Sequence, residues 1–233
     1  AKVAERRRTE LHEAIEAAKR LDWKIHFVTL TIPHGLGDDL SEMKKLQQKA
    51  LYKLSSGRNS VKSALLESDV EQHGYIRAYE VTHGRKNGFH PHFHILLFTS
   101  KNTTHKTVEG LYKSAWQKAC VSVGLPKPSD QHGCTVQDGS KAAKYASKWG
   151  IEDEMTKANT KVAKKKGTTP WGLLKAALDG DNPDYPPEYA EGLFRVYSKC
   201  MTGARQLYWS NGLRTKLALA PELTDEQLAE KIT

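Results

Sequence analysis

The chain has 233 residues, a formal net charge of +9 at pH 7 and a hydrophobic content of 38%. That length and composition are typical of a globular protein with one substantial core, and the excess of positive charge favours phosphate-rich partners such as nucleic acid. No segment approaches the roughly 18 consecutive apolar residues that a membrane span needs, and the charged first residues do not resemble a signal peptide. We therefore expect a cytoplasmic protein with no membrane partner.

The first 140 residues are predicted to alternate helices with strands. Helical composition covers 4–21, and the β-branched segment 23–33 is predicted to be a strand. A loop and a long helix follow in 35–56, with Asp39 or Ser41 as the cap. Further elements are predicted as strands at 74–82, 88–98 and 134–139 and a helix at 107–122. Since 83–88 is rich in glycine and contains asparagine, it predicts a hairpin that makes the strands on either side antiparallel neighbours.

The rest of the chain is predicted to be mainly helical. Lysines dominate 157–170, which has little apolar content and is predicted to be a loop. Helices are predicted at 140–150, 171–178, 186–203 and 221–233. The cysteines are far apart and outside any CxxC pattern, which predicts reduced structural thiols rather than disulfides or a zinc site: Cys120, Cys134 and Cys200.

The segment "GFHPHFHILLF" (88–98) places His90, His92 and His94 at alternate positions of a predicted strand, so that they share one face. Pairing across the hairpin would place Glu80 close to His92, with His94 one alternate position along. Two imidazole nitrogens and a carboxylate oxygen suit a divalent metal, and both manganese and magnesium are compatible. For a single histidine an ordinary surface role is the better interpretation, but three in alternation opposite a glutamate favour a metal site. Pro91 marks the beginning of the strand, so we expect His90 to support the ligands rather than to bind.

A second pattern, "KAAKYASKW", places Tyr145 and Lys148 three residues apart on one side of a predicted helix. Lys141 and Lys144 lie within one turn, and nearby cations stabilise a phenolate. Alone, this pattern is weak, and a packed tyrosine beside a solvated lysine face is the commoner case. Beside a metal site in a basic chain, it predicts tyrosine attack on a phosphodiester whose oxygen the metal polarises.

"FVTLTIP", "HPHFHILLF" and "KYASK" stand in the order and approximate spacing of the three motifs of HUH endonucleases, and the chain resembles a rolling-circle replication initiator of a small bacterial plasmid. The later "GARQLYWSNGLR" is similar to a segment near the end of that catalytic region. The resemblance implies an α+β fold with a central antiparallel β-sheet flanked by helices, and a helical C-terminal part. It divides the chain into a nicking and strand-transfer domain, 1–215, and an extension, 216–233, that links to any further region.

Carried over to this sequence, the resemblance makes His92 and His94 the paired metal ligands, Glu80 the third ligand and Tyr145 the nucleophile that stays joined to the 5′ phosphate, with Lys148 assisting. One position departs from the pattern. Some relatives carry a tyrosine or a glutamate where this chain has Lys141, so the termination step needs another group. Candidate acids are Asp138, Asp153, Glu154 and Glu188.

The expected partners are single-stranded or hairpin origin DNA and, beyond it, a host helicase and the replication machinery. Expected DNA contacts are Lys164, Lys165, Lys166 and Arg205, and most tryptophans are expected in the core with one or two at DNA. A single-strand transposase or a mobilisation relaxase would use the same chemistry. Two other classes stay open: a non-catalytic nucleic-acid-binding protein, and a zinc hydrolase, which would leave Tyr145 unexplained.

Overall fold

The structure is a computed structural model that describes residues 2–58, 60–141 and 167–221. The helices are α1 (Lys2–Arg20), α2 (Leu40–Ser55), α3 (Val61–Glu67), α4 (His105–Ser122), α7 (Pro170–Asp179), α8 (Pro187–Met201) and α9 (Leu213–Lys216), with the 3-10 turn η1 (Gly139–Lys141). The strands are β1 (Lys24–Leu30), β2 (Gln72–Gly84), β3 (Gly88–Thr99), β4 (Cys134–Asp138) and β5 (Leu207–Trp209).

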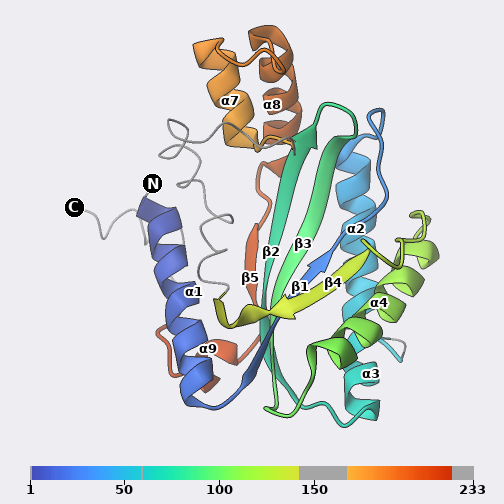
Figure 1. Cartoon of the computed structure of the whole chain (residues 1–233), viewed down its shortest axis with the longest axis vertical. Coiled ribbons are helices and arrows are strands. Elements are labelled where there is room, and N and C mark those ends of the chain that lie inside the picture. The colour runs from blue at the N-terminus through green and yellow to red at the C-terminus, as the bar shows by residue number, and fades with distance from the viewer. Residues whose placement is uncertain (1, 59, 142–166, 222–233) are drawn as a thin grey trace.

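The five strands form one sheet in the order β4-β1-β3-β2-β5, and every pairing in it is antiparallel. Helices cover both faces, as Figure 1 shows. This arrangement confirms the expected α+β class with a central antiparallel sheet. The division of the chain at residue 215 stays a prediction.

The β2–β3 hairpin is the longest pairing and runs through the middle of the sheet. Its register pairs Glu80 with His92, as predicted. The expected loop at 83–88 was too long, because the ladder continues to the pair Gly84 and Gly88. Gly88 has a φ of +71°, and a Cβ there would lie 2.9 Å from the carbonyl oxygen of Gly35. A side chain at this position would therefore be strained and would push the loop after β1 away from the hairpin.

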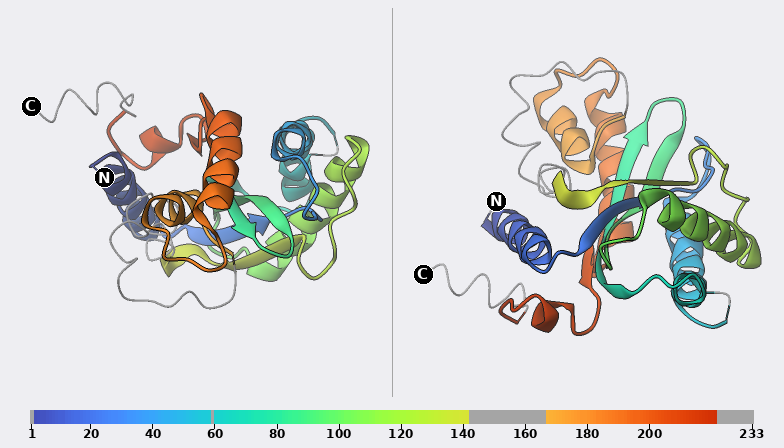
Figure 2. Two further views of the ribbon diagram at one scale, coloured as in Figure 1. Left: turned by 90° about the horizontal axis from the view of Figure 1, so that it is seen from above. Right: turned by 60° about the horizontal axis from the view of Figure 1, so that its bottom comes forward.

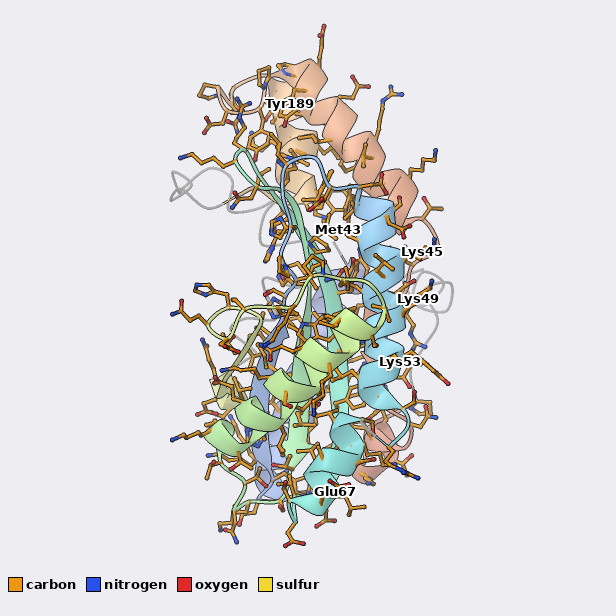
Figure 3. All side chains as sticks on the ribbon, turned by 90° about the vertical axis from the view of Figure 1, so that its right-hand side faces the viewer. Met43, Lys45, Lys49, Lys53, Glu67 and Tyr189 are labelled. Atoms are coloured by element: carbon orange, nitrogen blue, oxygen red, sulfur yellow. The ribbon has the colours of Figure 1, made fainter. Side chains whose placement is uncertain are left out.

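The two faces of the sheet carry separate apolar cores. Phe93, Ile95 and Leu97 of β3 pack with α2, α3 and α4, whereas Leu96 and Phe98 pack with α1, β5 and α9. Figure 2 shows α1 on one side of the sheet and α2 and α4 on the other, and Figure 3 looks onto the second layer. We call these the α2 face and the α1 face. Alternation along β3 therefore decides which layer each side chain meets.

Capping side chains explain two helix starts. Asp39 caps α2 by accepting a hydrogen bond from the backbone N–H of Glu42 at 2.8 Å, so Asp39 rather than Ser41 is the cap. Thr104 caps α4 in the same way through the N–H of Thr107, and this helix begins at His105, earlier than predicted.

Helices α7 and α8 confirm the helices predicted at 171–178 and 186–203 and lie at the hairpin end of the sheet (Figure 1). The Tyr185 hydroxyl donates to the carbonyl oxygen of His83 at 2.9 Å, which ties the loop before α8 to β2. A small core of its own holds the pair together: Leu173, Ala176, Tyr185 and Ala190. The hairpin end of β2 is therefore covered by a separate helical layer.

Some elements were missed by the sequence patterns, and some predicted elements lie outside the described residues. The sequence patterns missed α3, β5 and α9, and the strand predicted at 23–33 ends at Leu30. Residues 142–150 and 222–233, where helices were predicted, and most of the predicted loop 157–170 lie outside the described residues. The three cysteines are buried and free, as expected. Among the described helices, none is long and apolar enough to cross a membrane.

Candidate metal centre

Glu80, His92 and His94 converge on one point of the sheet. The Nε2 atom of His92 lies 3.2 Å from Oε2 of Glu80, and Nε2 of His94 lies 3.0 Å from the same oxygen. One ligand atom from each residue lies within 4.8 Å of the other two, and among the described residues no other group of three or more histidine, cysteine or acidic side chains does so. The predicted ligand set is therefore brought together.

Strand geometry explains this convergence. Antiparallel partners that lie directly opposite share a face, so Glu80 and His92 point the same way, and His94 follows two residues along β3. Both strands lie inside the sheet, each with a hydrogen-bonded neighbour on either side. The set lies on the α1 face, where the ring of Phe27 stacks on the ring of His94 with 5.0 Å between centroids. The backbone that carries the ligands is thus held from both sides.

Hydrogen bonds on Nδ1 orient both imidazoles. Nδ1 of His92 lies 3.0 Å from the carbonyl oxygen of His90, and a carbonyl can only accept. Nδ1 of His92 therefore carries a proton and donates it to this carbonyl, which points Nε2 of the same ring at Glu80. Nδ1 of His94 lies 3.0 Å from Oγ1 of Thr29 on β1, and this hydrogen bond holds the ring with its Nε2 toward Glu80.

The carboxylate of Glu80 stays ionised despite its environment. Burial works to raise its pKa, but the hydrogen bonds and charges of His92 and His94 outweigh burial and lower the pKa to about 2. At neutral pH the site therefore offers one negative oxygen and two imidazole nitrogens. This donor set fits a divalent cation with coordination positions left open, and it does not distinguish manganese from magnesium.

His34 is a neighbour of the site that the sequence reasoning missed. It follows Pro33 in the loop after β1, and its Nε2 lies 2.5 Å from Nδ1 of His90. Its own Nδ1 lies 2.8 Å from the carbonyl oxygen of Asn87 in the hairpin loop. His90, expected as a supporting residue, therefore connects this loop with the ligand His92. A histidine directly after a strand-ending proline was the available signal.

The other predicted site residues are placed less completely. Tyr145, Lys148 and Lys144 lie outside the described residues, as do Lys164, Lys165 and Lys166. Lys141 ends η1, and only its backbone is described. Arg205 lies before β5 with its guanidinium over the ring of Tyr208, 5.5 Å from the centroid.

Asp138, a candidate acid for termination, does not face this site. It pairs with His26 on β1, so it points to the α2 face, opposite the metal ligands. Its carboxylate accepts a hydrogen bond from the backbone N–H of Ser140 instead. Glu188 lies in the first turn of α8, whereas Asp153 and Glu154 are outside the described residues.

Trp116 and Trp209 are buried in the core, and Trp23 packs against it partly buried, whereas Trp149 lies outside the described residues. Two further tyrosines that could attack a phosphate in place of the predicted Tyr145, Tyr112 and Tyr189, differ in their exposure. Tyr112 is buried on the α2 face, and burial raises its pKa, which disfavours the phenolate. Tyr189 is partly exposed on α8 and stacks on Tyr185.

The chain is similar to two proteins with the name "Protein rep". The chain is similar to "Protein rep" of Streptomyces lividans, with 24% identity over 281 aligned positions that cover 94% of this chain and 61% of the relative. It is also similar to "Protein rep" of Lentilactobacillus hilgardii, with 27% identity over 97 positions that cover 40% of this chain and 28% of the relative. The chain thus spans about three-fifths of the Streptomyces protein.

No solved structure matches the chain significantly. A sequence model of the family Rep_1, described as "Replication protein", matches residues 1–216. That match includes all five strands and the three converging side chains. The chain therefore belongs to the Rep_1 family of replication proteins.

Proposed function

We propose that this protein nicks and rejoins one DNA strand at a plasmid replication origin and so initiates rolling-circle replication. The observation that carries the proposal is the convergence of Glu80, His92 and His94 on one sheet face, in a chain of the replication protein family. Single-stranded or hairpin origin DNA is the proposed substrate. A host helicase and the replication machinery would then act at the nick, in the cytoplasm.

Each described side chain has a definite task in this reaction. Glu80 supplies the negative oxygen, and the contacts of Nδ1 of His94 with Thr29 and of Nδ1 of His92 with the carbonyl of His90 hold both rings with Nε2 toward Glu80. A bound manganese or magnesium ion would neutralise charge on a non-bridging oxygen of the scissile phosphate. Because the ligands lie on central strands, the phosphate would be fixed with little reorganisation.

The covalent step is assigned to Tyr145. Its phenolic oxygen would form a bond to phosphorus as the bond from phosphorus to the 3′ oxygen breaks. The phenol loses its proton to solvent and the leaving oxygen gains one, which gives a free 3′ hydroxyl and a 5′ phosphotyrosine. Lys148 would stabilise the phenolate or the phosphate, with Lys141 and Lys144 adding positive charge. Lys164, Lys165, Lys166 and Arg205 are proposed contacts to the DNA backbone.

The test is a covalent adduct. The protein is incubated with labelled single-stranded origin oligonucleotides and manganese, and a denaturing gel is examined for labelled protein. The adduct should form with the parent chain and be absent for Tyr145→Phe, which removes only the phenolic oxygen, although this variant should keep its fold and its DNA affinity. Cleavage that persists in Tyr145→Phe would assign the attack to water or to another residue, and the proposed role of Tyr145 would be abandoned.

A further inference from the structure

A cavity of about 180 Å³ opens between α2, α3 and β2. It lies on the α2 face of the sheet, because its β2 residues Tyr75 and Arg77 alternate with the residues that face α1. Leu51, Leu54 and Ile95 give it mainly apolar walls. The cavity is smaller than the roughly 300–1,000 Å³ of drug-sized sites, so it suits a single ring system. The metal ligands are on the other face, which makes this a separate site.

Arg77 places a cation at this cavity without a matching anion. Its guanidinium lies 4.8 Å from the ring centroid of Tyr208 and 5.9 Å from that of Phe93. In the described part of the chain it forms no ion pair with a carboxylate. Burial lowers the pKa of Arg77, and Arg205 on the same tyrosine ring adds a like charge. Because a guanidinium binds phosphate oxygens through charge-assisted hydrogen bonds, Arg77 offers a place for a phosphate at this cavity.

Gln72 lines the same cavity and carries an unpaired acceptor. Its Oε1 atom is buried and has no hydrogen-bond partner among the described residues. A buried polar atom without a partner costs free energy, which a bound donor would restore. The exocyclic amino groups of adenine, cytosine and guanine are such donors, and so is the ring N3–H of thymine when the base is unpaired. Tyr75 lines the cavity as well and offers an aromatic ring to a base.

We propose that this cavity binds one nucleotide of single-stranded DNA, with its base between Tyr75 and Gln72 and its phosphate at Arg77. Aromatic rings, apolar walls and an unpaired guanidinium are the combination by which proteins hold single strands. The proposal rests on the proposed function, because it takes the DNA as the substrate. It adds a DNA contact on the sheet face opposite the metal centre, so that the strand would be held at two places.

The experiment measures the affinity of the 233-residue chain for labelled dA, dC and dT homopolymers of one length by fluorescence anisotropy over a range of salt. The parent should bind all three, because every unpaired base carries a donor for Gln72. Arg77→Gln should lower affinity roughly tenfold and reduce the salt slope by about 0.7. Gln72→Leu should weaken binding to each of the three. Arg195→Gln, which removes an exposed arginine of α8, is the matched control and should leave affinity unchanged.

Several readouts separate this proposal from its alternatives. A dC oligonucleotide carrying 5-iododeoxycytidine should photocrosslink to Tyr75. If Arg77→Gln and Gln72→Leu, each folded by circular dichroism, bind all three homopolymers like the parent, Arg77 is only a structural stack and the proposal fails. Binding of an acidic peptide instead of DNA, abolished in Arg77→Gln, would equally overturn it. Manganese binding and adduct formation report on the metal centre, so failure of the nicking chemistry is seen independently of this cavity.

Discussion

A single hydroxyl orients His94, one of the proposed metal ligands. Thr29 Oγ1 lies 3.0 Å from Nδ1 of His94, and its loss would free the ring to rotate or to take the other tautomer. Thr29→Val keeps the shape of the side chain and should weaken manganese binding about 10- to 100-fold, as measured by calorimetry. Thr31→Val is the control, because that hydroxyl donates to the carbonyl of His132. Unchanged affinity in Thr29→Val would show that packing alone orients His94.

Removing the ligands themselves should have a larger effect. The double variant His92→Ala, His94→Ala should lose manganese binding and adduct formation while keeping its fold, since the core lies around the site rather than in it. His34→Ala should be milder, because His34 acts on His92 only through His90. Calorimetry that finds full affinity in the double variant would refute the assignment of the ligands.

His26, a buried histidine away from the metal centre, makes the stability of the fold depend on pH. His26 is fully buried, bonded to Thr99 and His105, and burial together with the charge of His105 lowers its pKa from about 6.5 to about 3. Between these values the unfolded chain therefore binds a proton that the folded chain does not bind. Stability present above pH 6.5 should be lost as the pH falls toward 3, by at most about 1.4 kcal/mol per pH unit from this residue.

Denaturant unfolding at several pH values checks this. His26→Gln should flatten the dependence between pH 6 and pH 4, whatever it does to stability at neutral pH. His12→Gln removes an exposed histidine of α1 and should leave the dependence as in the parent. The same loss of stability with acid in His26→Gln as in the parent would place the responsible group elsewhere.

Among individual residues, contacts that follow from strand pairing could be predicted from the sequence, whereas contacts made by loop residues could not. Glu80 and His92 could be paired by counting back from the hairpin turn, because alternation and register are local properties. His34 and His90 are separated in the sequence by helices α2 and α3, and no local pattern predicts their contact. The same is true of Arg77, whose lack of a counter-ion becomes visible only when its neighbours are known.

At the scale of elements, the hairpin and the loop after β1 depend on one backbone position. Gly88→Ala would add a Cβ at a φ of +71°, 2.9 Å from the carbonyl oxygen of Gly35. We expect it to lower the free energy of unfolding by about 1–3 kcal/mol and to weaken metal binding by displacing His34 from His90. Gly84→Ala, at the paired position where a Cβ meets nothing within 4 Å, is the control for the hairpin. Equal effects of the two substitutions would contradict this reasoning.

Long amphipathic helices and alternating strands could be predicted, and short elements could not. Helices α2, α4 and α8 have apolar faces several turns long, whereas β5 has three residues and α9 has four. Such short segments are held by their neighbours, as when Ser210 accepts a hydrogen bond from the backbone N–H of Tyr75. Buried Gln47 of α2 similarly bonds Tyr79 and the carbonyl of Pro91, a polar contact that an apolar stripe does not reveal.

At the scale of the whole molecule, positive charge extends over a face that no motif identified. Figure 3 shows Lys45, Lys49 and Lys53 along the outer side of α2. All three are exposed, and at four-residue spacing they recur about every 6 Å. Lys45 pairs with Glu42, whereas Lys49 and Lys53 form no ion pair within the described chain. The row therefore offers unpaired charge to a DNA backbone.

Lys49→Glu, Lys53→Glu should lower single-strand affinity and reduce the slope of log affinity against log salt, by about 0.7 for each phosphate that the variant no longer neutralises. The exposed positions should leave thermal stability nearly unchanged. Lys175→Glu on α7, which removes a lysine already paired with Asp179, is the comparison. If the salt slope of the variant equals that of the parent, the lysines of α2 do not contact DNA, and other residues of this chain of net charge +9 make the electrostatic contacts.

The hairpin has a further consequence for the order of folding. All three proposed metal ligands fall within one supersecondary unit, and Glu80 and His94 are only 14 positions apart. Contacts so close in sequence close small loops, which cost little chain entropy and form early. The β1 and β4 strands that flank this unit in space must instead find partners far along the chain. A nascent chain would therefore assemble the ligand set before its sheet is complete, and hydrogen exchange during refolding should protect β2 and β3 first, sooner still when manganese is present.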